Sequence, residues 1–283
     1  MAVPSYAGPL ERSWYYAYRI ICGLILFFLI APILVIIPLS FNAVPYFTFT
    51  PEMLSLDPAG YSLRWYQDFF TNLNWQGAVK NSFIIAFFAT IISTTLGTIA
   101  ALGLSRSIMP FRSLVMGLLI SPMIVPLIIS AAGMYFFYTK INLAATHVGV
   151  ILAHAALGTP FVVITVTATL VGFDHSLTRA AASLGADAAT TFFKVTMPLI
   201  LPGVISGALF AFITSFDEVV VVLFVGSFEQ RTIPWQMFSG IREQISPTIL
   251  AVATLLVVIS IVLLTALELL RRRNERLRGI RPT

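Results

Sequence analysis

Six long segments with almost no charged residues constrain this 283-residue chain more than any other feature. They cover residues 20–41, 81–104, 114–138, 148–171, 199–225 and 249–270. A helix needs about 20 mostly apolar residues to cross the hydrocarbon core of a bilayer, and each segment is long enough. Charged residues make up 10% of the chain, against about 25% in an average soluble domain. The sequence therefore predicts an all-α polytopic membrane protein with six transmembrane helices.

Basic residues predict the orientation of the spans, because short cytoplasmic loops carry an excess of Lys and Arg. Of the 17 Lys and Arg residues, twelve fall in the two terminal segments and in the loops after the second and fourth spans. The other five fall in the remaining loops. We therefore expect both termini in the cytoplasm, with segments 1–19 and 271–283 flanking a transmembrane domain at 20–270. The net charge of +5 comes largely from the C-terminal tail and does not indicate a nucleic-acid partner.

A polar segment, residues 173–197, separates the fourth and fifth spans on the predicted cytoplasmic side. Leu177, Ala180, Ala181 and Leu184 follow the spacing i, i+3, i+4, i+7, which places them on one face of a helix. Gly185 then stands where a helix end accepts a left-handed residue, and Asp187 follows as a candidate N-cap. The same spacing recurs at Ala188, Thr191, Phe192 and Val195. We expect two short helices that dock a cytoplasmic partner. A helix lying on lipid headgroups would need basic residues and large apolar anchors. The segment has few basic residues, and its first face lacks large anchors.

The segment resembles the cytoplasmic loop of ATP-binding-cassette importer permeases. That loop reads Glu-Ala-Ala, three residues, Gly, nine residues, Ile, one residue, Leu-Pro. The matching residues here are Arg179-Ala180-Ala181, Gly185, Val195 and Met197-Pro198. Arg179 replaces the usual Glu and reverses the charge that the family presents to its ATPase. The resemblance implies ATPase coupling through Leu177, Arg179, Ala180, Ala181, Leu184, Gly185, Asp187 and Phe192.

The resemblance extends over nearly the whole chain. "SPMIVPLIISAAGMYFF" and "LPGVISGALFAFITSFDEVVVVLF" are similar to the polyamine-type branch of these permeases. Family membership implies a type I importer permease fold in a bacterial inner membrane. It also implies a second permease subunit, two ATPase subunits and an extracytoplasmic solute-binding protein. The implied substrate is a spermidine- or putrescine-like polyamine, and the alternative is another small organic solute.

The sequence lacks the motifs that would let it hydrolyse ATP itself. It has no GxxxxGK[ST] phosphate loop, and HExxH, CxxC and nucleophile-elbow motifs are also missing. We therefore expect no enzymatic activity and no cofactor, with energy supplied by a partner ATPase. A secondary transporter is the main rival, but it would be expected to show midplane charges and an inverted repeat. A membrane-embedded enzyme has no catalytic constellation to support it.

Two adjacent acids, Asp217 and Glu218, interrupt the fifth span. Asp217 comes 19 residues after Pro198, or about 28 Å along a helix, so the pair is expected near the outer mouth. Acids in spans usually face a cavity or a partner. One interpretation is a salt bridge to Arg231, Arg242 or the second permease.

The other interpretation is a direct contact with a cationic substrate. Asp217 is the better candidate, because Phe216 and Phe212 are near it in sequence and could offer aromatic faces to an ammonium group. The substrate-pathway residues predicted in this way are Asp217, Glu218 and Phe216.

Histidines and glycines in the spans indicate helix contacts. His147 and His154 are seven residues apart on one face, and we expect polar contacts at a helix interface rather than a metal site. Small residues that would allow close helix approach are Gly97, Gly103, Gly117, Gly133, Gly203 and Gly207.

Overall fold

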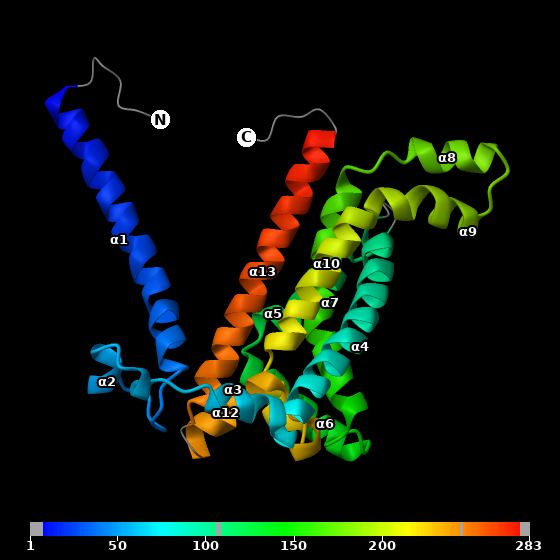
Figure 1. Ribbon diagram of the computed structural model, residues 1–283. Coiled ribbons are helices and arrows are strands. Elements are labelled where there is room, and N and C mark those ends of the chain that lie inside the picture. Colours follow the sequence, from blue (N-terminus) through cyan, green and yellow to red (C-terminus); the bar gives the residue numbers. More distant parts are fainter. Residues whose placement is uncertain (1–7, 106–108, 244–245, 278–283) are drawn as a thin grey trace. The chain divides into compact units, whose positions relative to one another are not determined.

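The computed structural model of the protein describes residues 8–105, 109–243 and 246–277, and all side chains in these ranges except those of 242–243, 266–268, 270 and 271–277 (Figure 1). Arg106 and the end of the predicted basic tail, 278–283, lie outside the described residues. The chain divides into two units, Met1–Asn72 with Gly240–Thr283, and Leu73–Ser239. In the described ranges β pairing is limited to one bridge between Asn42 and Tyr61, so the predicted all-α class is confirmed.

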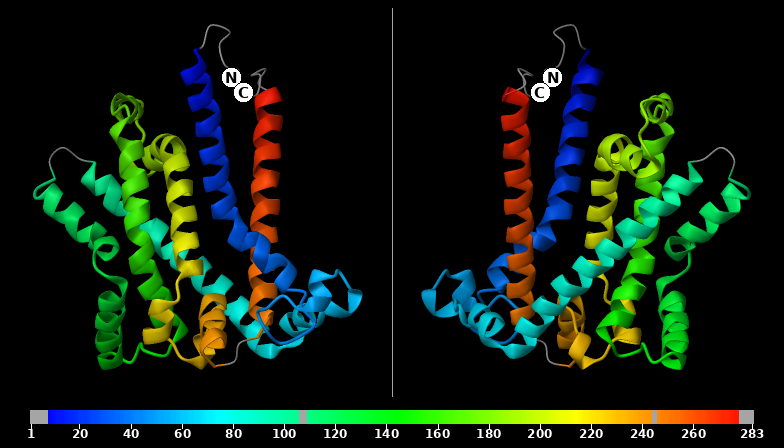
Figure 2. Two further views of the ribbon diagram at one scale, coloured as in Figure 1. Left: turned by 90° about the vertical axis from the view of Figure 1, so that its left-hand side faces the viewer. Right: turned by 90° about the vertical axis from the view of Figure 1, so that its right-hand side faces the viewer.

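The first unit contains the two terminal helices and the segment that follows the first of them. Its elements are α1 (Pro9–Leu39), α2 (Pro51–Leu54), η1 (Pro58–Gly60), α3 (Arg64–Thr71) and α13 (Thr248–Leu277). α13 packs against both α1 and α3, and α1 approaches α13 at the end nearest Leu39 (Figure 2). Thr248 Oγ1 donates to Asp68 Oδ2 at 2.8 Å, which joins α13 to α3.

The second unit contains the packed helical core. Its elements are α4 (Leu73–Leu104), α5 (Arg112–Ile124), α6 (Leu127–Lys140), α7 (His147–Val171), α8 (Ser176–Ser183), α9 (Ala188–Thr191), the π-helical turn η2 (Phe192–Thr196), α10 (Met197–Asp217), α11 (Val220–Val225) and η3 (Phe228–Gln230). α12 (Ile233–Glu243) crosses the boundary between the units. α4, α7 and α10 pack against one another along their lengths (Figure 1).

Glycines set the closest approaches between these three helices. A Cβ at Gly97 would lie 2.6 Å from Val162 Cβ, and one at Gly207 would lie 2.8 Å from Val162 Cα. A Cβ at Gly203 would likewise overlap the Thr169 side chain. The predicted close contacts are therefore confirmed for these three glycines. They are wrong for Gly103, Gly117 and Gly133, where a Cβ would meet nothing within 4 Å.

The predicted spans match helices except at two breaks. Among the described residues, five helices are long and apolar enough to cross a membrane, and α5 with α6 makes a sixth if that bent pair is one span. The third predicted span, 114–138, is bent by 101° between α5 and α6. Pro126 lies in this break; it has no N–H, and it disfavours helical backbone at Val125 (ψ 134°). The fifth, 199–225, is broken after Asp217.

Candidate functional site

The polar segment 173–197 forms two short helices that project sideways from the end of α7 and the start of α10 (Figure 1). Asp174, two residues before the first residue of α8, accepts two hydrogen bonds from it: Ser176 N donates to Oδ1 at 2.8 Å and Ser176 Oγ to Oδ2 at 2.7 Å. These hydrogen bonds, the side-chain one first, lower the pKa of the Asp174 carboxyl. α8 ends at Ser183 and packs against α9 and η2.

Gly185 makes the turn between the two helices. Its φ is +82°, in the left-handed region that favours glycine. The Gly185 amide donates to the Ala182 carbonyl at 3.0 Å, and the Ala186 amide donates to the Ala181 carbonyl at 3.0 Å. This pair of bonds is the Schellman motif that closes a helix C-terminus. The predicted glycine end of the first helix is confirmed.

Asp187 begins the second helix as predicted. Its Oδ1 accepts from Thr190 N at 2.8 Å, which satisfies an amide at the start of α9. Hydrogen bonding to Thr190 lowers the pKa of the Asp187 carboxyl. The helix then continues through the π-helical turn Phe192–Thr196 into α10.

The residues predicted to couple to an ATPase differ in side-chain exposure: some are exposed and others are buried or half-buried. Leu184 is 88% exposed, and Leu177 is also exposed. Arg179 and Ala180 lie open to solvent, whereas Ala181 is buried. Four of the predicted coupling residues are thus exposed: Leu177, Arg179 and Ala180 of α8, and Leu184 at its C-cap. They are called the outer surface of α8 below. Phe192 is half-buried in the turn that leads to α10.

The two acids have different surroundings because α10 ends between them. Asp217 is the last residue of α10 and is exposed. Glu218 is 8% exposed, and its Oε1 accepts from Val221 N at 2.9 Å at the start of α11. Within the described side chains, neither acid forms an ion pair with Arg231, whose guanidinium lies 3.6 Å from the centroid of the Phe228 ring. The side chain of Arg242 lies outside the described residues.

Aromatic rings from two helices lie next to the end of α10. The centroid of the Phe216 ring is 5.7 Å from that of Phe212, with the planes 20° apart. It is also 5.3 Å from the centroid of Phe83 on α4, at 65°. The two rings on α10 were expected from the sequence, whereas Phe83 was not, because no local pattern reveals which residue of a distant helix meets Phe216.

Polar contacts at helix interfaces involve both histidines of α7, as predicted. His154 Nδ1 is 2.8 Å from Ser215 Oγ on α10, in a fully buried position. His147 Nε2 is 3.1 Å from Asn81 Oδ1 on α4. Asn81 Nδ2 in turn donates to the carbonyls of Glu229 and Arg231 at 2.7 and 3.0 Å. Asn81 was not predicted from the sequence, although an amide at the first position of a predicted span is a usable signal.

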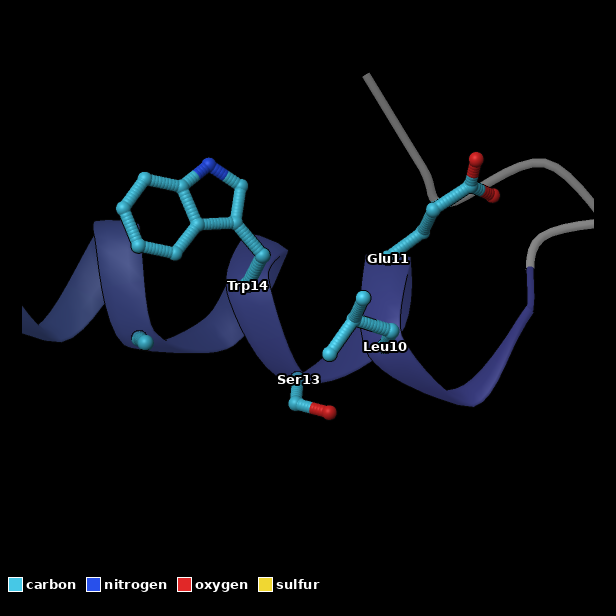
Figure 3. A pocket seen from close by; sticks show the side chains of 5 residues that line it. Leu10, Glu11, Ser13 and Trp14 are labelled. Atoms are coloured by element: carbon cyan, nitrogen blue, oxygen red, sulfur yellow. The ribbon is translucent and has the colours of Figure 1, made fainter.

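One shallow hollow lies on α1 alone. Leu10, Glu11, Ser13, Trp14 and Ala17 line it, and Figure 3 shows the first four of these side chains along one stretch of helix. It brings together no chemistry-bearing residues from other elements. No group of three or more potential metal ligands occurs among the described residues.

Residues 93–276 match the family described as "Binding-protein-dependent transport system inner membrane component". The chain belongs to this family. The matched range contains α8, the glycine turn and both acids. The protein is therefore an inner-membrane permease of the ABC importer type, with several membrane-spanning helices.

Curated relatives cover most of the chain. The "Spermidine/putrescine transport system permease protein PotC" of Haemophilus influenzae is 32% identical and covers 88% of this chain and 93% of its own. The "Putrescine transport system permease protein PotI" of Escherichia coli (strain K12) is 32% identical, with 96% of each chain covered. Among solved structures, a bacterial ABC transporter "involved in the import of the acidic polysaccharide alginate" matches with a TM-score of 0.71. It covers 94% of this chain and 99% of its own at 15% identity, which shows the importer fold alone.

Proposed function

We propose that this chain is a permease subunit of an ATP-driven polyamine importer, forming half of the translocation pathway across residues 20–270. Asp217 carries the proposal: it is the only charged residue of α10, it is exposed, and it directly follows Phe216. A polyamine carries several positive charges that must leave water on the way across. A carboxylate beside aromatic rings lowers the cost of that transfer. The relatives named for spermidine and putrescine support the same substrate class.

ATP hydrolysis belongs to two partner ATPase subunits, and segment 173–197 docks on one of them. Three exposed side chains, Leu177, Ala180 and Leu184, give α8 an apolar outer surface, and Arg179 adds a positive charge to it. Ala181 faces inward, so it supports the fold of the segment rather than contacting the ATPase. A second permease subunit and an extracytoplasmic solute-binding protein complete the transporter.

The decisive experiment compares the two acids. Asp217→Asn and Glu218→Gln are each reconstituted with the partner subunits in proteoliposomes, and uptake of radiolabelled putrescine and spermidine is measured per assembled complex. Losing one cation contact in Asp217→Asn should reduce uptake efficiency roughly tenfold. Glu218→Gln keeps an acceptor for Val221 N, so uptake per complex should stay near wild type. Unchanged uptake by Asp217→Asn would contradict the substrate role.

A further inference from the structure

Three phenylalanines on two packed helices form one continuous aromatic surface, defined here as Phe83, Phe212 and Phe216. Phe216 is in the middle: it stacks on Phe212 within α10 and meets Phe83 of α4 in an edge-to-face arrangement. The preferred centroid separation of aromatic pairs is about 4.5–7 Å, so both contacts are well formed. The surface therefore depends on a residue from outside α10.

The aromatic surface is partly exposed, and an acidic residue directly follows its central ring, Phe216, in the chain. Phe83 is 55% exposed, and Phe212 and Phe216 are half-buried. Asp217 is exposed and, among the described side chains, forms no ion pair. An acid in a membrane-spanning segment is costly without a partner. The missing positive charge would be supplied by a cation that passes over the rings.

We infer that Phe83 is a specificity-determining residue for alkylammonium solutes, an inference that rests on the proposed polyamine function. Ring faces attract ammonium groups, and they also remove methylene groups from water. A polyamine alternates these two kinds of group, so a carboxylate beside several rings matches it better than it matches a neutral or anionic solute. Phe83 extends this surface from α10 to α4 and sets the position of the Phe216 ring.

A cation of the chain itself is the competing occupant. Lys80 is exposed and lies three residues before Phe83 on α4, so the two side chains share one helical face. If the rings bound the Lys80 ammonium group instead, the aromatic surface would stabilise the protein and would not select substrate. The test therefore includes a Lys80→Gln background.

The experiment measures kcat/KM of uptake for putrescine and spermidine by the complete reconstituted importer, per assembled complex. Phe83→Leu keeps an apolar side chain but removes the ring, and Phe83→Tyr keeps the ring. Phe87→Leu is the matched control, because Phe87 is 57% exposed on the same helix and its ring meets Phe88 instead. Each variant is made with and without Lys80→Gln.

Phe83→Leu should lower kcat/KM roughly three- to tenfold, and more for spermidine, which brings an additional ammonium group. Phe83→Tyr and Phe87→Leu should stay near wild type, and the loss should persist with Lys80→Gln. Wild-type kcat/KM in Phe83→Leu, an equal loss in Phe83→Tyr or Phe87→Leu, or disappearance of the loss with Lys80→Gln would each overturn this inference alone. Failure of the wild-type importer to take up either polyamine would overturn the proposed function as well.

Discussion

Leu184→Ala tests whether the outer surface of α8 binds an ATPase. In the free protein the Leu184 side chain is 88% exposed, so its truncation should leave the fold of the segment unchanged. In a complex that covers it, the substitution removes three carbon atoms from an apolar contact. At about 0.8 kcal/mol for each buried CH₂-sized group, the loss is about 2 kcal/mol, which corresponds to about a thirtyfold weaker Kd.

The assay is a titration of the permease complex in lipid nanodiscs with purified ATPase subunit, read as Kd and as stimulated ATP hydrolysis. Leu209→Ala is the matched control, because it truncates a leucine that is 58% exposed on α10, outside the proposed docking segment. Leu184→Ala should weaken binding while the melting temperature stays unchanged, and Leu209→Ala should bind normally. A Kd for Leu184→Ala within twofold of wild type would refute the assignment of this surface.

Three further predictions concern the fold around the sites. Gly207→Ala should lower the free energy of unfolding by about 1–3 kcal/mol in denaturant titrations, because a Cβ there meets the α7 backbone; Gly133→Ala, with open space, should not. Asn81→Ala should cost about 1–3 kcal/mol and speed hydrogen exchange in residues 227–231, because two carbonyls lose their donor. Asp187→Ala should speed amide exchange at Thr190, whereas Asp187→Asn should not. Because hydrogen bonding lowers the pKa of Asp187, this cap is fully present above the pKa of an unfolded Asp, near 4, and weakens as pH falls through the lowered value.

Local signals predicted the polar segment well. A glycine that ends one helix and an aspartate that begins the next act within a few residues, and both Gly185 and Asp187 play these parts. Exposure was less predictable, since periodicity places residues on one face without saying what that face meets. Ala181 shares its face with Leu184, yet it is buried because α8 packs against α9 and η2.

Breaks in the spans were harder to predict than the spans themselves. Pro126 lies at a sharp bend, whereas Pro32 and Pro160 lie inside continuous helices, so proline alone does not locate a break. Contacts between helices that are distant in sequence could not be predicted either. Asn81 stands out as a polar residue at the start of a span, but its partners Glu229 and Arg231 lie more than a hundred positions away, as does Phe216, the partner of Phe83. A single sequence carries no pattern that pairs these residues.

The break after Asp217 gives the two adjacent acids different surroundings. Glu218 accepts a hydrogen bond from the amide of Val221, whereas Asp217 is the last residue of α10. At 1.5 Å per residue, the 21 residues of α10 span roughly 32 Å. The proposed ATPase-docking segment therefore meets one end of this helix, and the proposed substrate carboxylate lies at the other. α9 runs at a steep angle to α10 and joins it through the π-helical turn (Figure 1), so a displacement of the docking segment would reach Asp217 through this turn and α10. Such irregular turns are often found at functional sites.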